Sequence, residues 1–257
     1  MIKIFFLHVS LFFCLFCLGC SDRTNTVTQT STIDALLAGH YDGDMTCGEL
    51  LEYGNFGIGT FDRLEGEMAV IDGKVYQIKA DGKVYRPNTN ITTPFASVCM
   101  FQADDSIEVK SQCDFAGLEN VIGRAVGSDN IFCAIRIDGE FSYMKTRSVP
   151  AQTKPYPELA EVTKSQAVFE MNDIAGTIVG FRCPEFVKGV NVPGCHLHFL
   201  SDDRSKGGHI LECRMESGTI NIDRCNKFML LLPEDSDLFA ELDLTKDRTE
   251  QLKAAEK

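Results

Sequence analysis

Apolar and polar residues alternate along much of the chain, which is the pattern of strands with one buried face. Residues 57–87 alternate in three runs separated by Asp-Gly pairs at Asp72 and Asp81, so a β-meander is predicted there. Residues 130–150 alternate on both sides of Asp138, whose following glycine predicts a long hairpin turning at that point. Further strands are predicted in residues 92–102, 106–111, 176–184 and 217–233.

Shorter segments carry apolar residues at helical spacing. Ser31 or Thr32 can cap the first of them, and Asp114 can cap the longest. The predicted helices are residues 31–39, 46–54, 113–128, 156–166, 235–244 and 249–257. The pattern predicts the α+β class with mostly antiparallel sheet, in an N-terminal β-rich half (32–150) and a C-terminal half (151–257).

The N-terminus has the pattern of an export signal. One lysine precedes sixteen mostly apolar residues, 4–19, which is short for a spanning helix and suited to a signal-peptide core. The "CLGC" that ends this stretch resembles a bacterial lipobox, with Cys20 as the lipidated residue. We expect residues 1–20 to be the signal, residues 21–31 a flexible polar tether, and the protein to be membrane-tethered outside the cytoplasm. An uncleaved anchor and a cytoplasmic location are the alternatives.

The net charge of the chain argues against one class of binding partner. The formal net charge is −12, and a strongly anionic chain repels the phosphates of nucleic acid, so no nucleic-acid partner is expected. Eight cysteines follow the signal, and none of them forms a CxxC pair, which argues against a structural zinc knuckle. Disulfides can form outside the cytoplasm, but their pairing stays open.

Three of the five histidines lie within residues 195–209, "CHLHFLSDDRSKGGH". Read as a hairpin, this stretch puts His196 and His198 on one face of a strand, because side chains at i and i+2 share a face. His209 opens the return strand and can lie opposite them. Three imidazoles on two strands suit zinc, with other divalent transition metals possible, and leave one coordination position open for catalysis. The alternative is an ordinary hairpin with surface histidines.

Two further places carry candidate chemistry. Glu65 and Glu67 are predicted to share a strand face, where like charges repel unless a cation is near, so either can be a metal ligand or a general base. A solvated pair is the alternative. Arg147, with Lys145 on the same face, has a planar guanidinium that can donate two parallel hydrogen bonds to a carboxylate.

The segment "LEGEMAV" (64–70) is similar to "CHLHFLS" (195–201), and a duplicated structural unit would bring the two segments face to face.

These blocks, in this order, resemble the α-acetolactate decarboxylase family from about residue 32 to the C-terminus. The resemblance rests on "YDGD" (41–44), "GIGTFDRLEGEM" (57–68), "AIRIDGEF" (134–141), "TRSVPAQTKPYPEL" (146–159), "GTIVGF" (176–181) and "HLHF" through "GGH" (196–209). It implies a fold of two similar β-α-β(n) motifs, with the metal site at a β-hairpin, and a homodimer. Cys195 departs from the family pattern, which has a larger residue there.

The resemblance also implies roles for individual residues. His196, His198 and His209 would bind Zn²⁺. Glu67, Arg147 and Glu256 would be catalytic, with Glu250 as the alternative for the last. Thr60 and Leu64 would line the substrate pocket.

The activity that the resemblance implies is decarboxylation of (S)-2-hydroxy-2-methyl-3-oxobutanoate, (S)-2-acetolactate, to (R)-acetoin and CO₂, in acetoin and 2,3-butanediol biosynthesis. No organic cofactor is needed, since a metal can draw the electron pair into the ketone. A zinc hydrolase that uses metal-bound hydroxide and a non-catalytic metal-binding lipoprotein are the alternatives. The hydrolase needs the histidines but no carboxylate-binding arginine, and the binding protein needs neither Glu67 nor Arg147.

Overall fold

The structure is a computed structural model, and the residues described are 24–234 and 236–256. The expected signal peptide and its Cys20 lie outside the described residues. Within the described part of the chain, no helix is both long and apolar enough to cross a membrane.

The first of two large sheets is mixed. Its strand order is β15 (Lys227–Leu231), β1 (Thr26–Thr30), β8 (Ala96–Cys99), β3 (Phe56–Thr60), β4 (Glu67–Ile71), β5 (Lys74–Ile78) and β6 (Val84–Tyr85). Only β1 and β15 run parallel within it. The predicted turn at Asp72 joins β4 to β5, and its two residues have φ of 51° and 70°, as a tight hairpin turn requires.

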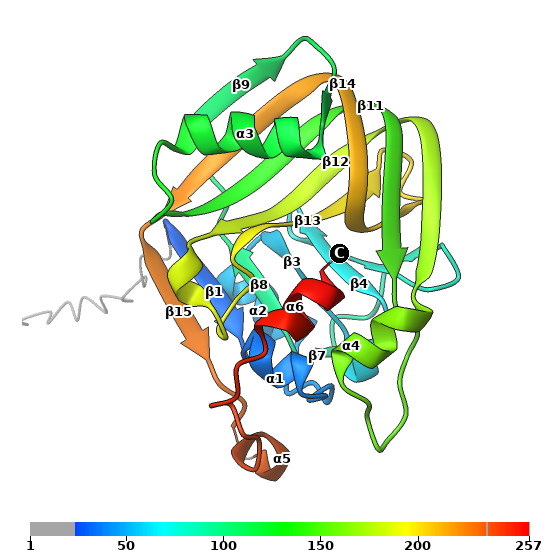
Figure 1. Cartoon of the computed structure of the whole chain (residues 1–257), viewed down its shortest axis with the longest axis vertical. Coiled ribbons are helices and arrows are strands. Elements are labelled where there is room, and N and C mark those ends of the chain that lie inside the picture. Colours follow the sequence, from blue (N-terminus) through cyan, green and yellow to red (C-terminus); the bar gives the residue numbers. More distant parts are fainter. Residues whose placement is uncertain (1–23, 235, 257) are drawn as a thin grey trace, which may run out of the picture.

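The second sheet is antiparallel and has longer, curved strands (Figure 1). It contains β10 (Cys113–Asp114), β14 (Gly207–Cys225), β11 (Phe132–Ser148), β12 (Ala167–Cys183) and β13 (Gly194–Ser201), with β9 (Asp105–Val109) paired to β14. Because β13 pairs with both β12 and β14, the strands β11, β12, β13 and β14 close on one another at one end. A small third sheet pairs β2 (Met45–Thr46) with β7 (Thr92–Thr93).

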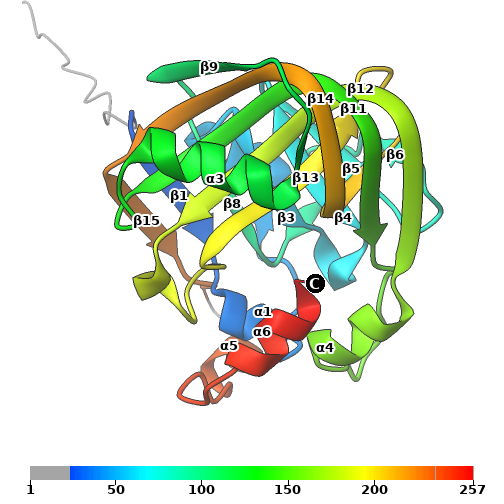
Figure 2. The same ribbon diagram turned by 45° about the horizontal axis from the view of Figure 1, so that its top comes forward.

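The helices are short and lie around the sheets. They are α1 (Ile33–Leu37), α2 (Cys47–Tyr53), α3 (Phe115–Val126), α4 (Leu159–Val162), α5 (Asp237–Ala240) and α6 (Thr249–Ala255), with 3₁₀ turns η1 (Asp62–Leu64), η2 (Thr163–Ser165) and η3 (Glu185–Val187). Thr32 and Asp114 cap α1 and α3 as predicted, and Thr46 forms a capping box with Glu49. Figure 2 shows α1, α4, α5 and α6 gathered at one end of the molecule, where the described chain also ends.

The core has two main layers. One fills the curved second sheet beneath α3 and includes Leu197 and Phe199, which alternate with the histidines of β13 as predicted. The other lies between the two sheets and includes Ile58, Ile78 and Val179. Full burial of such side chains contributes about 1.5–3 kcal/mol each, which fixes the two sheets face to face. The α+β class and the mostly antiparallel, mixed sheets are therefore confirmed.

The predicted tether is wrong from residue 26 onward. Residues 26–30 form β1, and every one of them is buried between β15 and β8. The sequence "TVTQT" is polar, but its glutamine finds partners inside the protein: Gln29 Nε2 donates to the carbonyls of Ser31 and Val190, each over 2.7 Å. A hydrogen-bonded polar strand therefore replaces the expected flexible segment.

Two further expectations about the strands are corrected. Asp138 and Gly139 do not turn, because β11 runs straight through them. Neither residue has a positive φ, and the Asp138 carboxylate instead accepts hydrogen bonds from Arg136 and Thr177. The division at residue 150 is wrong too, since the second sheet begins with β9 and the chain returns to the first sheet in β15.

Candidate metal centre and active site

Three histidines converge where the second sheet closes on itself. His196 and His198 lie two apart on β13, and His209 on β14 is the direct partner of His198 in the ladder. The ring centroids are 5.2, 5.0 and 5.4 Å apart for the pairs 196–198, 196–209 and 198–209. One ring nitrogen of each lies within 4.8 Å of those of the other two, and all three residues are buried. The hairpin predicted from the sequence thus brings the three imidazoles together.

The protonation of these imidazoles suits metal binding. Burial lowers the pKa of His196 to about 3, and the nearby Arg147 acts in the same direction. Burial likewise holds the pKa of His198 and His209 well below the usual value, so all three rings are neutral. His198 Nδ1 lies 2.8 Å from the carbonyl oxygen of Met68, which requires the proton on Nδ1 and leaves a lone pair on Nε2.

That lone pair has no partner in the protein. His198 Nε2 is a buried atom without a hydrogen bond. A buried polar atom left unpaired costs about 1–3 kcal/mol, and a cation at the centre of the three rings would relieve this cost. The carbonyl of Met68 acts as the outer partner that orients a ligand histidine. These residues therefore fit a divalent transition-metal ion.

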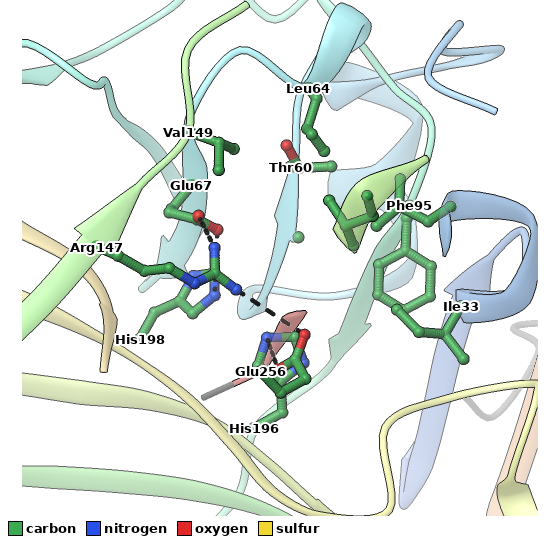
Figure 3. Close-up of a pocket in the computed structure, with 13 residues that line it drawn as sticks. Ile33, Thr60, Leu64, Glu67, Phe95, Arg147, Val149, His196, His198 and Glu256 are labelled. Atoms are coloured by element: carbon green, nitrogen blue, oxygen red, sulfur yellow. Dashed lines mark hydrogen bonds and ion pairs between the residues drawn. The ribbon is translucent and has the colours of Figure 1, made fainter. Parts of the chain in front are cut away.

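Glu67 and Arg147 form a buried ion pair beside the histidines (Figure 3). Arg147 Nη1 donates to Glu67 Oε1 over 2.7 Å, and Nη2 donates to the carbonyl of Ala255 over 3.0 Å. The other oxygen of Glu67, Oε2, lies 3.6 Å from His198 Nε2. Burial raises the pKa of Glu67 to about 7, Arg147 opposes that rise and Glu256 adds to it. Glu67 can therefore exchange a proton near neutral pH.

Glu256 reaches the centre from the end of α6. Its Oε2 lies 3.6 Å from His196 Nε2 and 3.7 Å from His209 Nε2, and its Oε1 lies 3.9 Å from Arg147 Nη2. Burial raises the pKa of Glu256, against the opposing effect of Arg147. Glu250, the alternative weighed from the sequence, is on the exposed side of α6 and pairs with Lys253 over 2.9 Å. Of the two glutamates, Glu256 is the one at the site.

The loop before Glu67 has a backbone that few residues adopt. Arg63 and Leu64 have φ of 58° and 60°, and Gly66 has φ of 85°. A Cβ at Gly66 would lie 2.3 Å from the carbonyl oxygen of Ile78, so no larger residue fits without a shift. Thr60 Oγ1 donates to the Gly66 carbonyl over 2.8 Å. Thr60 thus supports the loop that presents Leu64 and Glu67 to the cavity.

A small cavity of about 30 Å³ lies among these residues. The predicted Thr60, Leu64, Glu67, Arg147, His196, His198 and Glu256 all line it. Sequence reasoning missed its apolar wall of Ile33, Leu36, Phe95, Val149 and Leu159. Ile33 and Leu36 lie on α1 and Leu159 on α4, while Phe95 and Val149 lie in connecting segments. Nothing in the sequence distinguishes these five from other core residues.

Glu65 and Lys145 do not belong to the cavity. β4 begins at Glu67, so Glu65 lies in the preceding turn rather than on a shared strand face, and it pairs with Lys79 over 3.0 Å. Lys145 and Arg147 keep continuous register with β12, but Lys145 is half-buried and does not line the cavity. The expected face-sharing of Glu65 with Glu67 is therefore wrong.

Comparison with known proteins identifies the family. The model of the alpha-acetolactate decarboxylase family matches residues 27–246. The chain belongs to the alpha-acetolactate decarboxylase family. The alpha-acetolactate decarboxylase of Methanosarcina mazei is 47% identical over 237 residues, covering 92% of this chain and 82% of that protein. That of Methylococcus capsulatus is 42% identical over 230 residues, covering 90% of this chain and 88% of the relative.

Solved structures agree with this family assignment. The crystal structure of alpha-acetolactate decarboxylase from Bacillus subtilis strain 168 superposes with a TM-score of 0.88 at 35% identity, covering 90% of this chain and 99% of that one. A Staphylococcus aureus protein of unknown function similar to alpha-acetolactate decarboxylase gives 0.86 at 32% identity, with the same coverage. The resemblance noted from the sequence is confirmed. The family match includes the histidines, Glu67 and Arg147 and ends before α6, so Glu256 is placed by the structure alone.

Proposed function

We propose that this chain catalyses the zinc-dependent decarboxylation of (S)-2-acetolactate to (R)-acetoin and CO₂. The observation that carries the proposal is a cavity lined by His196, His198, a guanidinium and two carboxylates, with His209 completing the three-histidine cluster beside it. A hydrolase or a metal-binding protein would need the histidines, but not a buried arginine held between two glutamates. Membership of the alpha-acetolactate decarboxylase family supports the same substrate.

The charges of the cavity favour an anionic substrate. With both carboxylates ionised, Arg147, Glu67 and Glu256 together carry one net negative charge, and the neutral histidines add none. A bound divalent cation would make the total positive by one charge. A carboxylate substrate would then enter a site of opposite sign, where low polarity strengthens the attraction.

The residues have separate duties in the proposed reaction. When bound, Zn²⁺ would supply Lewis-acid chemistry that stabilises the electron pair left on the substrate when the C–C bond to CO₂ breaks. Arg147 is rigidly oriented by Glu67 and by the Ala255 carbonyl, and its guanidinium stabilises negative charge that develops on the substrate. Arginine is suited to this duty because it stays charged even when buried.

The product needs a proton delivered to one face of the carbon that loses CO₂. We assign this duty to Glu67, because it lies in the cavity wall and its pKa of about 7 lets it hold and release a proton near neutrality. Glu256 contacts the opposite side of the histidine cluster and closes the site. A single donor on one wall accounts for a single enantiomer of acetoin.

Substrate entry requires part of the wall to move. A cavity of about 30 Å³ has room for little more than one water molecule, and acetolactate is several times larger. One part of the wall is Glu256, which follows α6 at the end of the described chain. α6 packs on α4, and its Leu252 and Ala255 belong to the hydrophobic cluster between them. We infer that α6 shifts to admit the substrate.

The test is product analysis with the zinc-loaded protein. Racemic acetolactate should give equal amounts of CO₂ and acetoin, and the acetoin should be the R enantiomer. His198→Ala, prepared in the same way, is the control for spontaneous decarboxylation. Racemic acetoin at the control's rate would contradict the proposal.

A further inference from the structure

A second cluster of metal-binding side chains lies away from the histidines. Cys99 ends β8 of the first sheet, while Asp223 and Cys225 lie near the end of β14 in the second sheet. Asp223 and Cys225 are two apart on a strand and so share a face. Two residues after Cys225 the chain begins β15 and thus crosses into the first sheet. The cluster therefore joins the sheets where the chain passes between them, whereas His209 lies near the other end of β14.

The three side chains are close together and sealed from solvent. One ligand atom of each lies within 4.8 Å of those of the other two. Each residue is 1% exposed. The Cys225 thiol donates to the backbone carbonyl of Asp223 over 3.9 Å. Cysteine sulfurs and a carboxylate oxygen at this separation can all reach one central ion with small side-chain adjustments, since zinc–ligand distances are about 2.0–2.3 Å.

The carboxylate of Asp223 has a hydrogen-bond partner for only one of its two oxygens. Its Oδ2 accepts a hydrogen bond from the Gln102 backbone N–H over 2.8 Å, but Oδ1 is buried without any partner. Among the described residues, no cationic side chain forms an ion pair with Asp223. A buried carboxylate oxygen without a partner is costly. The unpaired atom therefore points to a ligand that the protein groups do not supply.

We propose that Cys99, Asp223 and Cys225 form a second metal site, for a thiophilic divalent cation of the zinc class. Two sulfurs and one oxygen are a donor set that such ions prefer. On binding, the two thiols release their protons and no electron is transferred. A disulfide between the cysteines would use both sulfurs but leave Asp223 Oδ1 unpaired, so the geometry favours the cation. Its role is to fasten the two sheets together, independently of catalysis.

Cobalt substitution tests this site, because thiolate ligands give Co²⁺ charge-transfer bands in the near ultraviolet that histidine and carboxylate ligands do not. The metal-free protein should bind two Co²⁺ per chain and develop these bands. Cys99→Ser/Cys225→Ser should bind one and show none, and Asp223→Asn should bind the second ion at least tenfold more weakly. Cys213→Ser removes a buried cysteine from the other core layer and should keep both ions.

The histidine site provides an internal check. His198→Ala should lose the ion at the histidines and retain the thiolate bands, together with a rise in melting temperature on adding Co²⁺. If the serine variant misfolds, Asp223→Asn still measures the second affinity. One Co²⁺ per chain without thiolate bands would overturn the proposal. A Cys99–Cys225 disulfide found by mass spectrometry in protein isolated without reductant would also overturn it.

Discussion

Arg147 and Glu67 come from different sheets, 80 residues apart in the sequence, yet Arg147 Nη1 lies 2.7 Å from Glu67 Oε1 in the interior. Each residue is 5% exposed. A buried pair of this kind is weak evidence for stability, since desolvation offsets much of the attraction, but removal of one partner leaves the other charge uncompensated. The pair therefore fixes the orientation of both side chains beside the histidines.

Arg147→Lys should lower kcat/KM by about 30- to 1,000-fold, which corresponds to about 2–4 kcal/mol of lost transition-state stabilisation. Lysine keeps the charge but cannot contact Glu67 and the Ala255 carbonyl with two nitrogens of one planar group. Zinc content should stay the same, because Arg147 is not a ligand. Lys145→Arg, on the same strand but outside the cavity, is the matched control. Near-normal turnover in Arg147→Lys would remove the residue from the mechanism.

Glu67→Gln separates a proton carrier from a metal ligand. The amide keeps the shape of the side chain but cannot exchange a proton, so acetoin formation should fall by about 10²- to 10⁴-fold. Zinc stoichiometry, measured on the same samples, should not change. The control is Glu65→Gln, which alters a carboxylate outside the cavity that contacts Lys79 and Gln77. A parallel loss of zinc would assign Glu67 to the metal and contradict its proposed duty.

Glu256→Gln should reduce activity at least tenfold, while Glu250→Gln on the same helix should leave it unchanged. Glu256 lies within 4 Å of two histidines and Arg147, whereas Glu250 contacts only Lys253 on the exposed side of α6. The measurement is the steady-state rate of acetoin formation by each of the two variants. Equal effects, or a larger loss in Glu250→Gln, would show that the chain end is placed differently when the enzyme works.

The location of the protein is a separate prediction. We propose that residues 1–20 direct export and that Cys20 is lipidated, from the apolar run and the "LGC" that precede the folded part. Stable anchoring needs more than one acyl chain, so labelled fatty acid should enter the native chain and not Cys20→Ala. Residues from Thr26 onward belong to β1, so a tether would end before Thr26. Unprocessed native protein in the cytosolic fraction would refute the idea.

The histidine centre could be predicted from the sequence because its geometry is local. The spacing of His196 and His198 fixes their common face, and the short turn fixes His209 opposite them. The caps at Thr32 and Asp114 were also predictable, since a cap depends on its own first helical turn. In each case the determining contacts lie within a few residues.

Other features depend on distant parts of the chain. Asp72 and Asp138 each precede a glycine, but only the first pair turns, because β11 is held open by β12 and β14 on both sides. The polar strand β1 is buried because Asn191 and Val190 supply partners for Gln29. Neither outcome is encoded in the local pattern of apolar residues.

The central claim is that the three histidines hold the metal on which the reaction depends. Its most direct test is the acetoin-forming rate of chelated protein as zinc is returned, with bound metal counted at each step. We predict no activity above the spontaneous rate without metal and recovery as zinc is returned to the native chain. His196→Ala, His198→Ala and His209→Ala should fail to recover. Full activity in protein verified to be metal-free, or in any of these variants, would contradict the account.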